Sequence, residues 1–309
     1  MSEPGGGRTP EAHAVGTYPA EVAALPTLSG AAKLAGVIGW PIAHSLSPRL
    51  HGLWLRRYGI DGAYVPLAVR PEHLADVLAT LPKLGFRGVN LTVPHKERAL
   101  ALVHEATPAA RRIGAVNTIV IAADGTMTGS NTDVFGFRES LRQAQPQWIG
   151  GKDAAVVIGA GGAARAVVVA LIEAGVPEIR VVNRTPARAS ALAADLGGPI
   201  KVVPWSDREV ALAGAALLVN TTTLGMQRQP PLVLGLDLLP GDAVVCDIVY
   251  VPAKTPLLAA ARARGNPCVG GIGMLLHQAR PGFAAWFGPL PEITPDLAGL
   301  VLGGRPGGC

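Results

Sequence analysis

Short apolar runs alternate with longer segments whose apolar residues recur every three or four positions, from residue 33 onward. The short runs predict strands and the longer segments predict amphipathic helices. In the first half of the chain we expect strands at 33–39, 63–69, 88–93 and 115–121. Ser47 as N-cap, followed by Pro48, predicts a helix that ends at Gly59, and Pro71 begins another. Together these elements predict a small α/β domain, with Pro66 marking an edge strand.

A second series of alternating elements begins near residue 153. Strands are expected at 153–158, 179–183, 217–220, 243–248 and 268–270. Helices are expected from the glycine turn after the first of these strands to Gly175, after Thr185 and Pro186, and over 255–265. Strands that alternate with helices predict a doubly wound parallel sheet with right-handed crossovers. The chain should cross from the first unit to the second between 134 and 151.

Composition and charge narrow the class of protein. Hydrophobic residues make up 49% of the 309 residues, and the formal charge of +5 is scattered without a basic stripe. This excludes nucleic acid as an expected partner and suits a protein that handles small anionic molecules. Three cysteines without a C-x-x-C pair predict neither a disulfide scaffold nor a metal site, and favour the cytoplasm.

The two ends of the chain carry no element pattern. Residues 1–30 are rich in glycine and proline and have no apolar core typical of a signal peptide, so they predict a flexible extension. Residues 301–309 predict a flexible tail for the same compositional reason. No stretch is apolar enough to predict a membrane span.

The sequence VVIGAGGAARA is the sharpest local motif. A predicted strand leads into Gly159, Gly161 and Gly162, and a helix begins at once, with Ala164 where a third glycine is common. Small residues there allow the backbone to approach a pyrophosphate at the N-terminus of the helix. The flanking strands and helices favour a dinucleotide site over a simple tight turn.

The residues after the next predicted strand select the dinucleotide. NAD-binding folds usually carry an acidic residue at this point, whereas this chain has Asn183, Arg184 and Thr185, with Arg188 one helical turn further on. A guanidinium can bind a 2′-phosphate through charge-assisted hydrogen bonds. The sequence therefore predicts NADP(H), the alternative being that Arg184 is a solvated loop residue.

Polar clusters lie where the strands of the first domain end, and their order resembles a known family. The clusters are HSLSP (44–48), NLTVPHK (90–96), GAVNT (114–118) and GSNTD (129–133), followed by NTTTLGM (220–226), YVPAKTP (250–256) and GGIGMLLHQ (270–278). From Val37 to Gln278 the chain resembles the shikimate dehydrogenase family. The resemblance implies reversible reduction of 3-dehydroshikimate to shikimate by NADPH, with family members known as monomers and homodimers.

The resemblance also implies two domains and assigns residues to each site. It implies a substrate-binding and catalytic domain over 31–133, completed by 273–300, and a Rossmann-type NADP domain over 134–272. Lys96 and Asp133 would be the catalytic pair. The implied substrate ligands are Ser45, Ser47, Thr92, Lys96, Asn117, Asp133, Tyr250 and Gln278. The implied cofactor-binding residues are Gly159, Ala160, Gly161, Gly162, Ala163, Asn183, Arg184, Thr185, Arg188, Ile248 and Gly271.

The chemistry of ketone reduction gives an independent reason for a lysine. The nicotinamide supplies a hydride, so another group must protonate or stabilise the developing alkoxide. Lys96 can do both, and Asp133 would chiefly orient it. Each polar residue also has a plainer interpretation: Lys96 as an exposed charge, Ser47 and Asp133 as helix caps, Asn117 as a strand-end polar residue, Gln278 as an exposed helix residue.

Two other functions compete with this prediction. A quinate/shikimate or aminoshikimate dehydrogenase would share the fold and the lysine, but such relatives often differ at the serine pair and at Arg184. A non-catalytic NADP-sensing protein would be expected to have lost the lysine–aspartate pair, and here Lys96 and Asp133 are both present.

Overall fold

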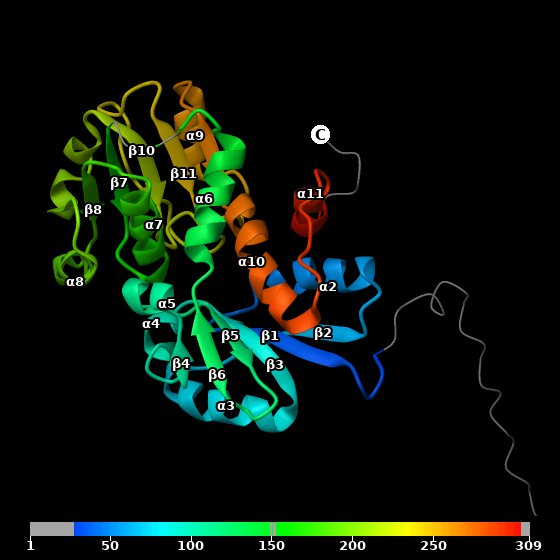
Figure 1. Ribbon diagram of the computed structural model, residues 1–309. Coiled ribbons are helices and arrows are strands. Elements are labelled where there is room, and N and C mark those ends of the chain that lie inside the picture. Colours follow the sequence, from blue (N-terminus) through cyan, green and yellow to red (C-terminus); the bar gives the residue numbers. More distant parts are fainter. Residues whose placement is uncertain (1–27, 149, 151–152, 304–309) are drawn as a thin grey trace, which may run out of the picture.

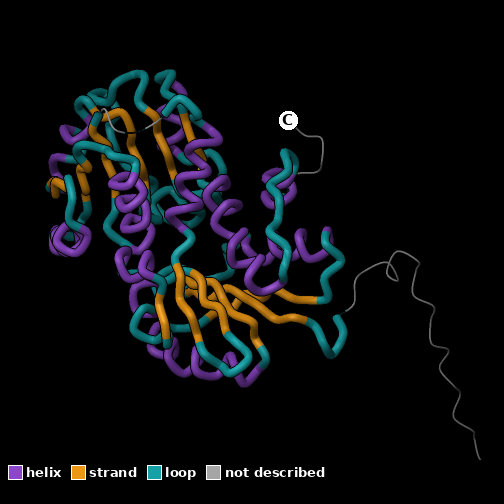
Figure 2. Tube along the Cα trace, in the orientation of Figure 1, coloured by secondary structure: helices purple, strands orange, loops and turns teal. Residues whose placement is uncertain are grey.

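The computed structural model describes residues 28–148, 150 and 153–303. Two six-stranded sheets, each covered by helices, make up the molecule (Figure 1). This confirms the predicted α/β class with two domains. The tube in Figure 2 shows the same two groups of strands, with helices along their faces. Of the flexible extension predicted for 1–30 and the flexible tail predicted for 301–309, residues 1–27 and 304–309 lie outside the described residues.

The first sheet is mixed and has the strand order β2-β1-β3-β5-β6-β4. Its strands are β1 (Lys33–Gly39), β2 (Gly62–Ala68), β3 (Phe86–Leu91), β4 (Glu105–Ala106), β5 (Thr118–Ile121) and β6 (Met127–Ser130). The strands β2, β1 and β3 run parallel, whereas β5 is antiparallel to both β3 and β6. β2 lies at the edge, as Pro66 predicted. The short strands β4 and β6 were not predicted, because neither has an apolar run.

Helices cover both faces of this sheet. They are α2 (Ser47–Arg57), α3 (Leu74–Thr80), α4 (Lys96–Ala99) and α5 (Pro108–Ile113), with 3-10 turns η1 (Pro71–His73) and η2 (Leu81–Leu84) around α3. Leu74, Leu78 and Leu81 pack beneath the sheet against Val89 and Ile119. The prediction that Ser47 caps α2 is wrong: Leu46 is the N-cap residue, and no side chain caps this helix.

The second sheet is parallel throughout, with the order β12-β11-β10-β7-β8-β9. Its strands are β7 (Ala154–Ile158), β8 (Ile179–Val182), β9 (Ile200–Val203), β10 (Ala215–Asn220), β11 (Val244–Asp247) and β12 (Cys268–Gly270). The accompanying elements are α7 (Gly162–Glu173), α8 (Pro186–Leu196), α9 (Pro256–Ala263), η3 (Trp205–Asp207) and η4 (Val210–Leu212). Strand order reverses between β7 and β10, where ligands of such sheets bind. β9 was not predicted, because its IKVV sequence is only half-buried.

Two helices connect the sheets. α6 (Asp133–Ala144) leads from the first sheet to the second, and α10 (Ile272–Phe287) returns beside it (Figure 1). The lower end of α10 packs Phe283 and Trp286 against Trp54 of α2. The last helix, α11 (Leu297–Leu302), buries Val301 completely in this core. The predicted tail therefore begins too early, because 301–302 still belong to a packed helix.

Gly136 allows α6 and α10 to approach closely. A Cβ atom at this position would lie 2.5 Å from Cβ of Gln278 and 2.9 Å from the carbonyl oxygen of Met274. Gly52 is also inside a helix, α2, but a Cβ atom there would have no atom within 4 Å. The two glycines therefore have opposite expected responses to the same substitution.

We expect Gly136→Ala to lower the free energy of unfolding by about 1–3 kcal/mol, because α10 must move away from α6. The matched variant Gly52→Ala should raise it by about 0.5–1 kcal/mol, because alanine orders a helix better than glycine. Urea unfolding followed by circular dichroism measures both. Two variants that shift the midpoint in the same direction would contradict the packing described for α6 and α10.

Candidate active site

Lys96 and Asp133 form an ion pair between the first residues of two helices. Nζ of Lys96, at the start of α4, lies 2.6 Å from Oδ2 of Asp133, at the start of α6. The side chains are only 15% and 4% exposed, respectively. Partial exclusion of water strengthens the attraction between such charges. Lys96 is therefore not the solvated surface charge that most lysines are.

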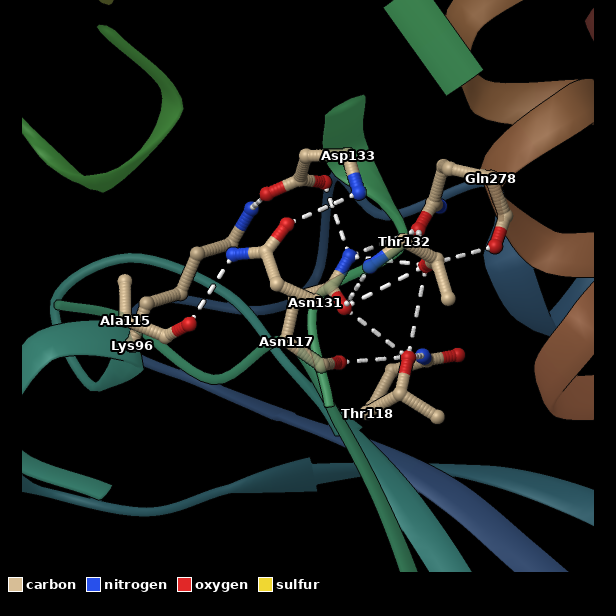
Figure 3. A network of polar contacts seen from close by, with 9 residues as sticks. Lys96, Ala115, Asn117, Thr118, Asn131, Thr132, Asp133 and Gln278 are labelled. Atoms are coloured by element: carbon tan, nitrogen blue, oxygen red, sulfur yellow. Dashed lines mark hydrogen bonds and ion pairs between the residues drawn. The ribbon is translucent and has the colours of Figure 1, made fainter. Parts of the chain in front are cut away.

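Asn117 fixes the other oxygen of the aspartate (Figure 3). Its Nδ2 donates to Oδ1 of Asp133 at 2.8 Å, while its Oδ1 accepts from the backbone N–H of Thr132 and from Oγ1 of Thr118, both at 2.9 Å. Asn131 adds a backbone constraint: its Oδ1 accepts from N–H of Asp133 at 3.0 Å. Both carboxylate oxygens of Asp133 thus have partners, and the side chain is held in one orientation.

Gln278 joins this network from α10, a helix distant in sequence (Figure 3). Its Oε1 lies 3.2 Å from Nδ2 of Asn117, and its backbone oxygen accepts from Oγ1 of Thr132 at 2.8 Å. The close approach of α6 and α10 at Gly136 produces this contact. The alternative that Gln278 is a plain exposed helix residue is therefore wrong.

Two buried residues that the sequence analysis did not assign support the network from below. Tyr64 of β2 donates its hydroxyl to Oδ1 of Asn90 at 2.6 Å. Asn90 in turn donates from Nδ2 to Oγ1 of Thr118 and to the carbonyl of Asn117, both at 3.0 Å. The only signal for Asn90 was its place at the start of the NLTVPHK cluster. No such signal pointed to Tyr64, because an aromatic residue in a predicted strand is normally interpreted as part of the hydrophobic core.

Burial also sets the protonation of these lower residues. It raises the pKa of Tyr64 well above its usual range, although a hydrogen bond with Ser47 opposes the shift. The ring of His51 stacks on Tyr64 with a centroid distance of 3.8 Å, and burial lowers the pKa of His51 to about 3. Both rings are therefore neutral near pH 7. The stacked rings of His51 and Tyr64 therefore place no charge beside the polar network.

Residues Ser45 to Ser47, before and at the start of α2, lie against Tyr250. Ser45 Oγ accepts from the backbone N–H of Ser47 at 3.3 Å, and Ser47 is buried. Burial raises the pKa of Tyr250, while hydrogen bonds with the backbone of Leu46 and the side chain of Ser45 oppose the shift. Three of the expected substrate ligands are thus brought together: Ser45 just before α2, Ser47 at its first residue, and Tyr250 in the loop after β11. Thr92, half-buried, lies in the turn between β3 and Lys96.

Asp247 holds the loop that carries Tyr250. It is completely buried at the end of β11, and burial raises the pKa of its carboxyl. Its oxygens accept from Oγ1 of Thr255 at 2.7 Å, Nδ2 of Asn220 at 3.0 Å and N–H of Val249 at 3.1 Å. Buried polar groups need such partners. Sequence analysis missed this cluster, because β11 shows only as an apolar run.

A cavity of about 270 Å³ opens beside Lys96. The second domain lines it with the glycine turn 159–163, Asn183, Arg184, Arg188, Trp205 and 221–224, and the first domain with Val93, Pro94, Lys96 and Glu97. The expected residues Thr185, Ile248 and Gly271 do not line this cavity. The carbonyl of Thr185 instead accepts from Nδ2 of Asn183 at 2.9 Å, and Ile248 and Gly271 lie against each other.

The glycine turn fits a phosphate group. α7 begins after Gly161 without a side-chain cap, so its first N–H groups have no intrahelical partner, and Gly161, Gly162 and Ala163 line the cavity. Gly159 has a φ of +117°, and a Cβ atom there would meet Oγ1 of Thr221 at 2.4 Å. A Cβ atom on Gly162 would lie 3.2 Å from Cβ of Lys96. With two arginines in the same cavity, the residues suit a dinucleotide that carries a further anionic group.

Neither a membrane-spanning helix nor a metal site is present in the described part of the chain. No helix there is long and apolar enough to cross a membrane. No cluster of three or more His, Cys, Asp or Glu side chains within the described ranges could hold a metal ion. Cys246 and Cys268 are both free thiols.

Comparison with known proteins gives the family. Residues 37–119 match the shikimate dehydrogenase substrate binding domain, and 144–226 match shikimate / quinate 5-dehydrogenase. The shikimate dehydrogenase (NADP(+)) of Paramagnetospirillum magneticum is 62% identical over 89% of this chain and all of its own length. That of Rhodospirillum rubrum is 60% identical over 89% of this chain and 99% of its own.

Solved structures agree with these sequence relatives. Shikimate 5-dehydrogenase from Thermus thermophilus, in complex with NADP(H) and shikimate, is 40% identical and superposes with a TM-score of 0.75 over 87% of this chain and 97% of its own. Quinate dehydrogenase from Corynebacterium glutamicum, in complex with NAD, is 33% identical with a TM-score of 0.80 over 88% and 99%. The chain belongs to the shikimate dehydrogenase family.

Proposed function

We propose that this chain catalyses the reversible reduction of 3-dehydroshikimate to shikimate with NADPH. Its relatives at 60–62% identity carry that enzyme name with NADP(+), and the chain is an NADP-dependent oxidoreductase of shikimate biosynthesis. The position of Lys96 carries the assignment to this site. Its side chain lines the cavity of the glycine turn, while its ammonium group pairs with Asp133 of the polar network. The proton donor of this reaction must lie between the cofactor and the substrate, and Lys96 has that position.

The polar network supplies the substrate side of the proposal. Thr92, Lys96, Asn117, Asp133 and Gln278 would bind the ring hydroxyls. Ser45, Ser47 and Tyr250 would bind the carboxylate. Burial supports both assignments, because a substrate that lacks a hydroxyl leaves buried donors and acceptors unpaired and binds poorly. Asn90 and Tyr64 support these ligands from beneath.

The proposed chemistry assigns separate roles to the two catalytic residues. When bound, the nicotinamide supplies a hydride to the ketone carbon. Lys96 stabilises the charge that develops on the ketone oxygen and donates a proton to it. In the oxidation direction, neutral Lys96 accepts the proton of the hydroxyl. Asp133, with both oxygens already engaged, orients the ammonium group and binds substrate.

The cofactor side rests on the cavity. Residues 159–163 would hold the pyrophosphate at the N-terminus of α7, and Asn183, Arg184, Thr185 and Arg188 would bind the adenosine half with its 2′-phosphate. Ile248 and Gly271 would contact the nicotinamide half. A Cβ atom on Gly271 would lie 2.1 Å from the carbonyl oxygen of Ile248, so the two backbones are in contact although neither residue lines the cavity described above.

Domain division and location complete the proposal. The substrate domain would comprise 31–133 and the part of the chain from 273 onward, because α10 packs its lower half against α2 and β1. The NADP domain would comprise 134–272. The cytoplasm is the proposed compartment, supported by free thiols at Cys246 and Cys268 and by biosynthetic relatives.

A comparison of shikimate and quinate, each with NADP⁺ or NAD⁺, tests the proposed specificity. Steady-state turnover should be largely confined to shikimate with NADP⁺. Comparable turnover of quinate would place the chain with enzymes such as the quinate dehydrogenase of Corynebacterium glutamicum, which shares the fold at 33% identity. Absence of turnover with every pair would contradict the proposed activity and favour an NADP-sensing protein.

Arg184→Gln tests the cofactor half separately. It should raise KM for NADP⁺ by roughly ten- to a hundredfold, the loss expected for a charged hydrogen bond, and change KM for NAD⁺ little. The same steady-state assay measures this. Equal effects on both cofactors would show that Arg184 does not recognise the 2′-phosphate.

Lys96→Ala tests the proton donor. We expect kcat to fall by about a hundredfold or more, in the range for a lost general acid, with a small change in KM for shikimate. Asp133 keeps its hydrogen bonds with Asn117 and the backbone, so the fold should survive. Exposed Lys83→Ala, on η2, is the matched control. Loss of substrate binding with an intact kcat would contradict the catalytic assignment.

A further inference from the structure

Glu97 reaches from the first domain to the second at the mouth of the cofactor cavity. Its Oε1 lies 3.3 Å from a guanidinium nitrogen of Arg188. Glu97 follows Lys96 on α4, whereas Arg188 belongs to α8 of the parallel-sheet domain. Both side chains line the cavity. The ion pair is therefore a contact between the domains made inside the cofactor site.

The pair brings Glu97 into conflict with the anion expected there. Arg188 is a proposed ligand of the NADP 2′-phosphate, and the present inference rests on that part of the proposed function. A carboxylate and a phosphate dianion cannot both take the best position on one guanidinium. Glu97 is 47% exposed, so its side chain can turn into solvent when the phosphate arrives.

We propose that Glu97 is a specificity-determining residue that competes with the 2′-phosphate for Arg188. Binding of NADP(H) breaks the Glu97–Arg188 pair, whereas NAD(H), which has no 2′-phosphate, leaves it intact. Glu97 thus lowers the affinity for NADP(H) selectively, and it does so only through Arg188.

Glu173 provides a matched control for this substitution. Glu173, at the far end of α7 from the glycine turn, pairs with Arg112 at 3.5 Å and Arg138 at 3.3 Å on the protein surface. Replacing Glu173 by Gln removes the same negative charge. The arginines that lose their partner, Arg112 and Arg138, are 50% and 59% exposed, close to the 56% of Arg188. It leaves the residues of the cofactor cavity unchanged, since Glu173 does not line it.

Isothermal titration calorimetry with NADP⁺ and NAD⁺ on the full chain tests the proposal. Glu97→Gln should lower Kd for NADP⁺ by about two- to fivefold, the range set by an exposed ion pair, and leave Kd for NAD⁺ unchanged. Glu173→Gln should change neither. The gain should shrink at high ionic strength, because salt screens half-exposed charges. In the Arg188→Gln background, Glu97→Gln should have no further effect.

The outcomes separate this inference from the proposed function. Four results for Glu97→Gln would each overturn the competition. They are a higher Kd for NADP⁺, an equal change of Kd for both cofactors, an unchanged Kd for NADP⁺, and a tighter NADP⁺ binding that persists in the Arg188→Gln background. If Arg188→Gln weakens NADP⁺ alone while Glu97→Gln does nothing, the proposed 2′-phosphate site stands and only the role of Glu97 fails. If Arg188→Gln leaves NADP⁺ affinity intact, the 2′-phosphate assignment of Arg188 fails, and the role of Glu97 fails with it.

Discussion

The orientation of the Asp133 carboxylate is the constraint on which the site depends. One oxygen pairs with Lys96 and the other accepts from Asn117, so the ammonium group can take only a narrow set of positions. The Asp133 side chain is only 4% exposed, so its two oxygens depend on these partners for their hydrogen bonds. Thr118 and Thr132 in turn fix the side chain of Asn117. Asn90, which accepts from Tyr64, donates to both Thr118 and Asn117. Lys96, the proposed proton donor, contacts Asp133 directly, and the hydrogen bonds behind that carboxylate fix where it lies.

The same lysine connects this network with the cofactor cavity. α4 presents Lys96 and Glu97 to the cavity, while the glycine turn meets the lysine stem closely enough that Gly162 can carry no side chain without displacing it. Behind them, Ile113 and Ala115 of the first domain pack on Ala166 and Val169 of α7 in a shared apolar cluster. The strand ends, the helix N-terminus and the Lys96–Asp133 pair therefore meet at one place, where α/β sheets bind their ligands.

The sequence predicted the strongly patterned parts of the fold well. Strands β1, β7, β8, β10 and β12 lie within a few residues of their expected bounds, because buried parallel strands are continuous apolar runs. Strands β4, β6 and β9 escaped prediction, since short or half-exposed strands leave no such run. Ser47 shows the limit of local rules: Ser-Pro before an apolar helix predicts a cap, yet burial against Tyr64 takes the hydroxyl elsewhere. Asn90, Tyr64 and Asp247 were missed because only tertiary packing brings their partners within reach.

A double-mutant cycle on Lys96 and Asp133, the proposed catalytic pair, tests the central claim most directly. The measurement is kcat at saturating shikimate and NADP⁺ for Lys96→Ala, Asp133→Asn and the double variant. If Asp133 acts on the rate by orienting Lys96, the double variant should be no slower than Lys96→Ala alone, within about twofold, because residues that act as a unit are not additive. Losses that multiply would contradict the account, since Asp133 would then act on the reacting atoms independently of the lysine.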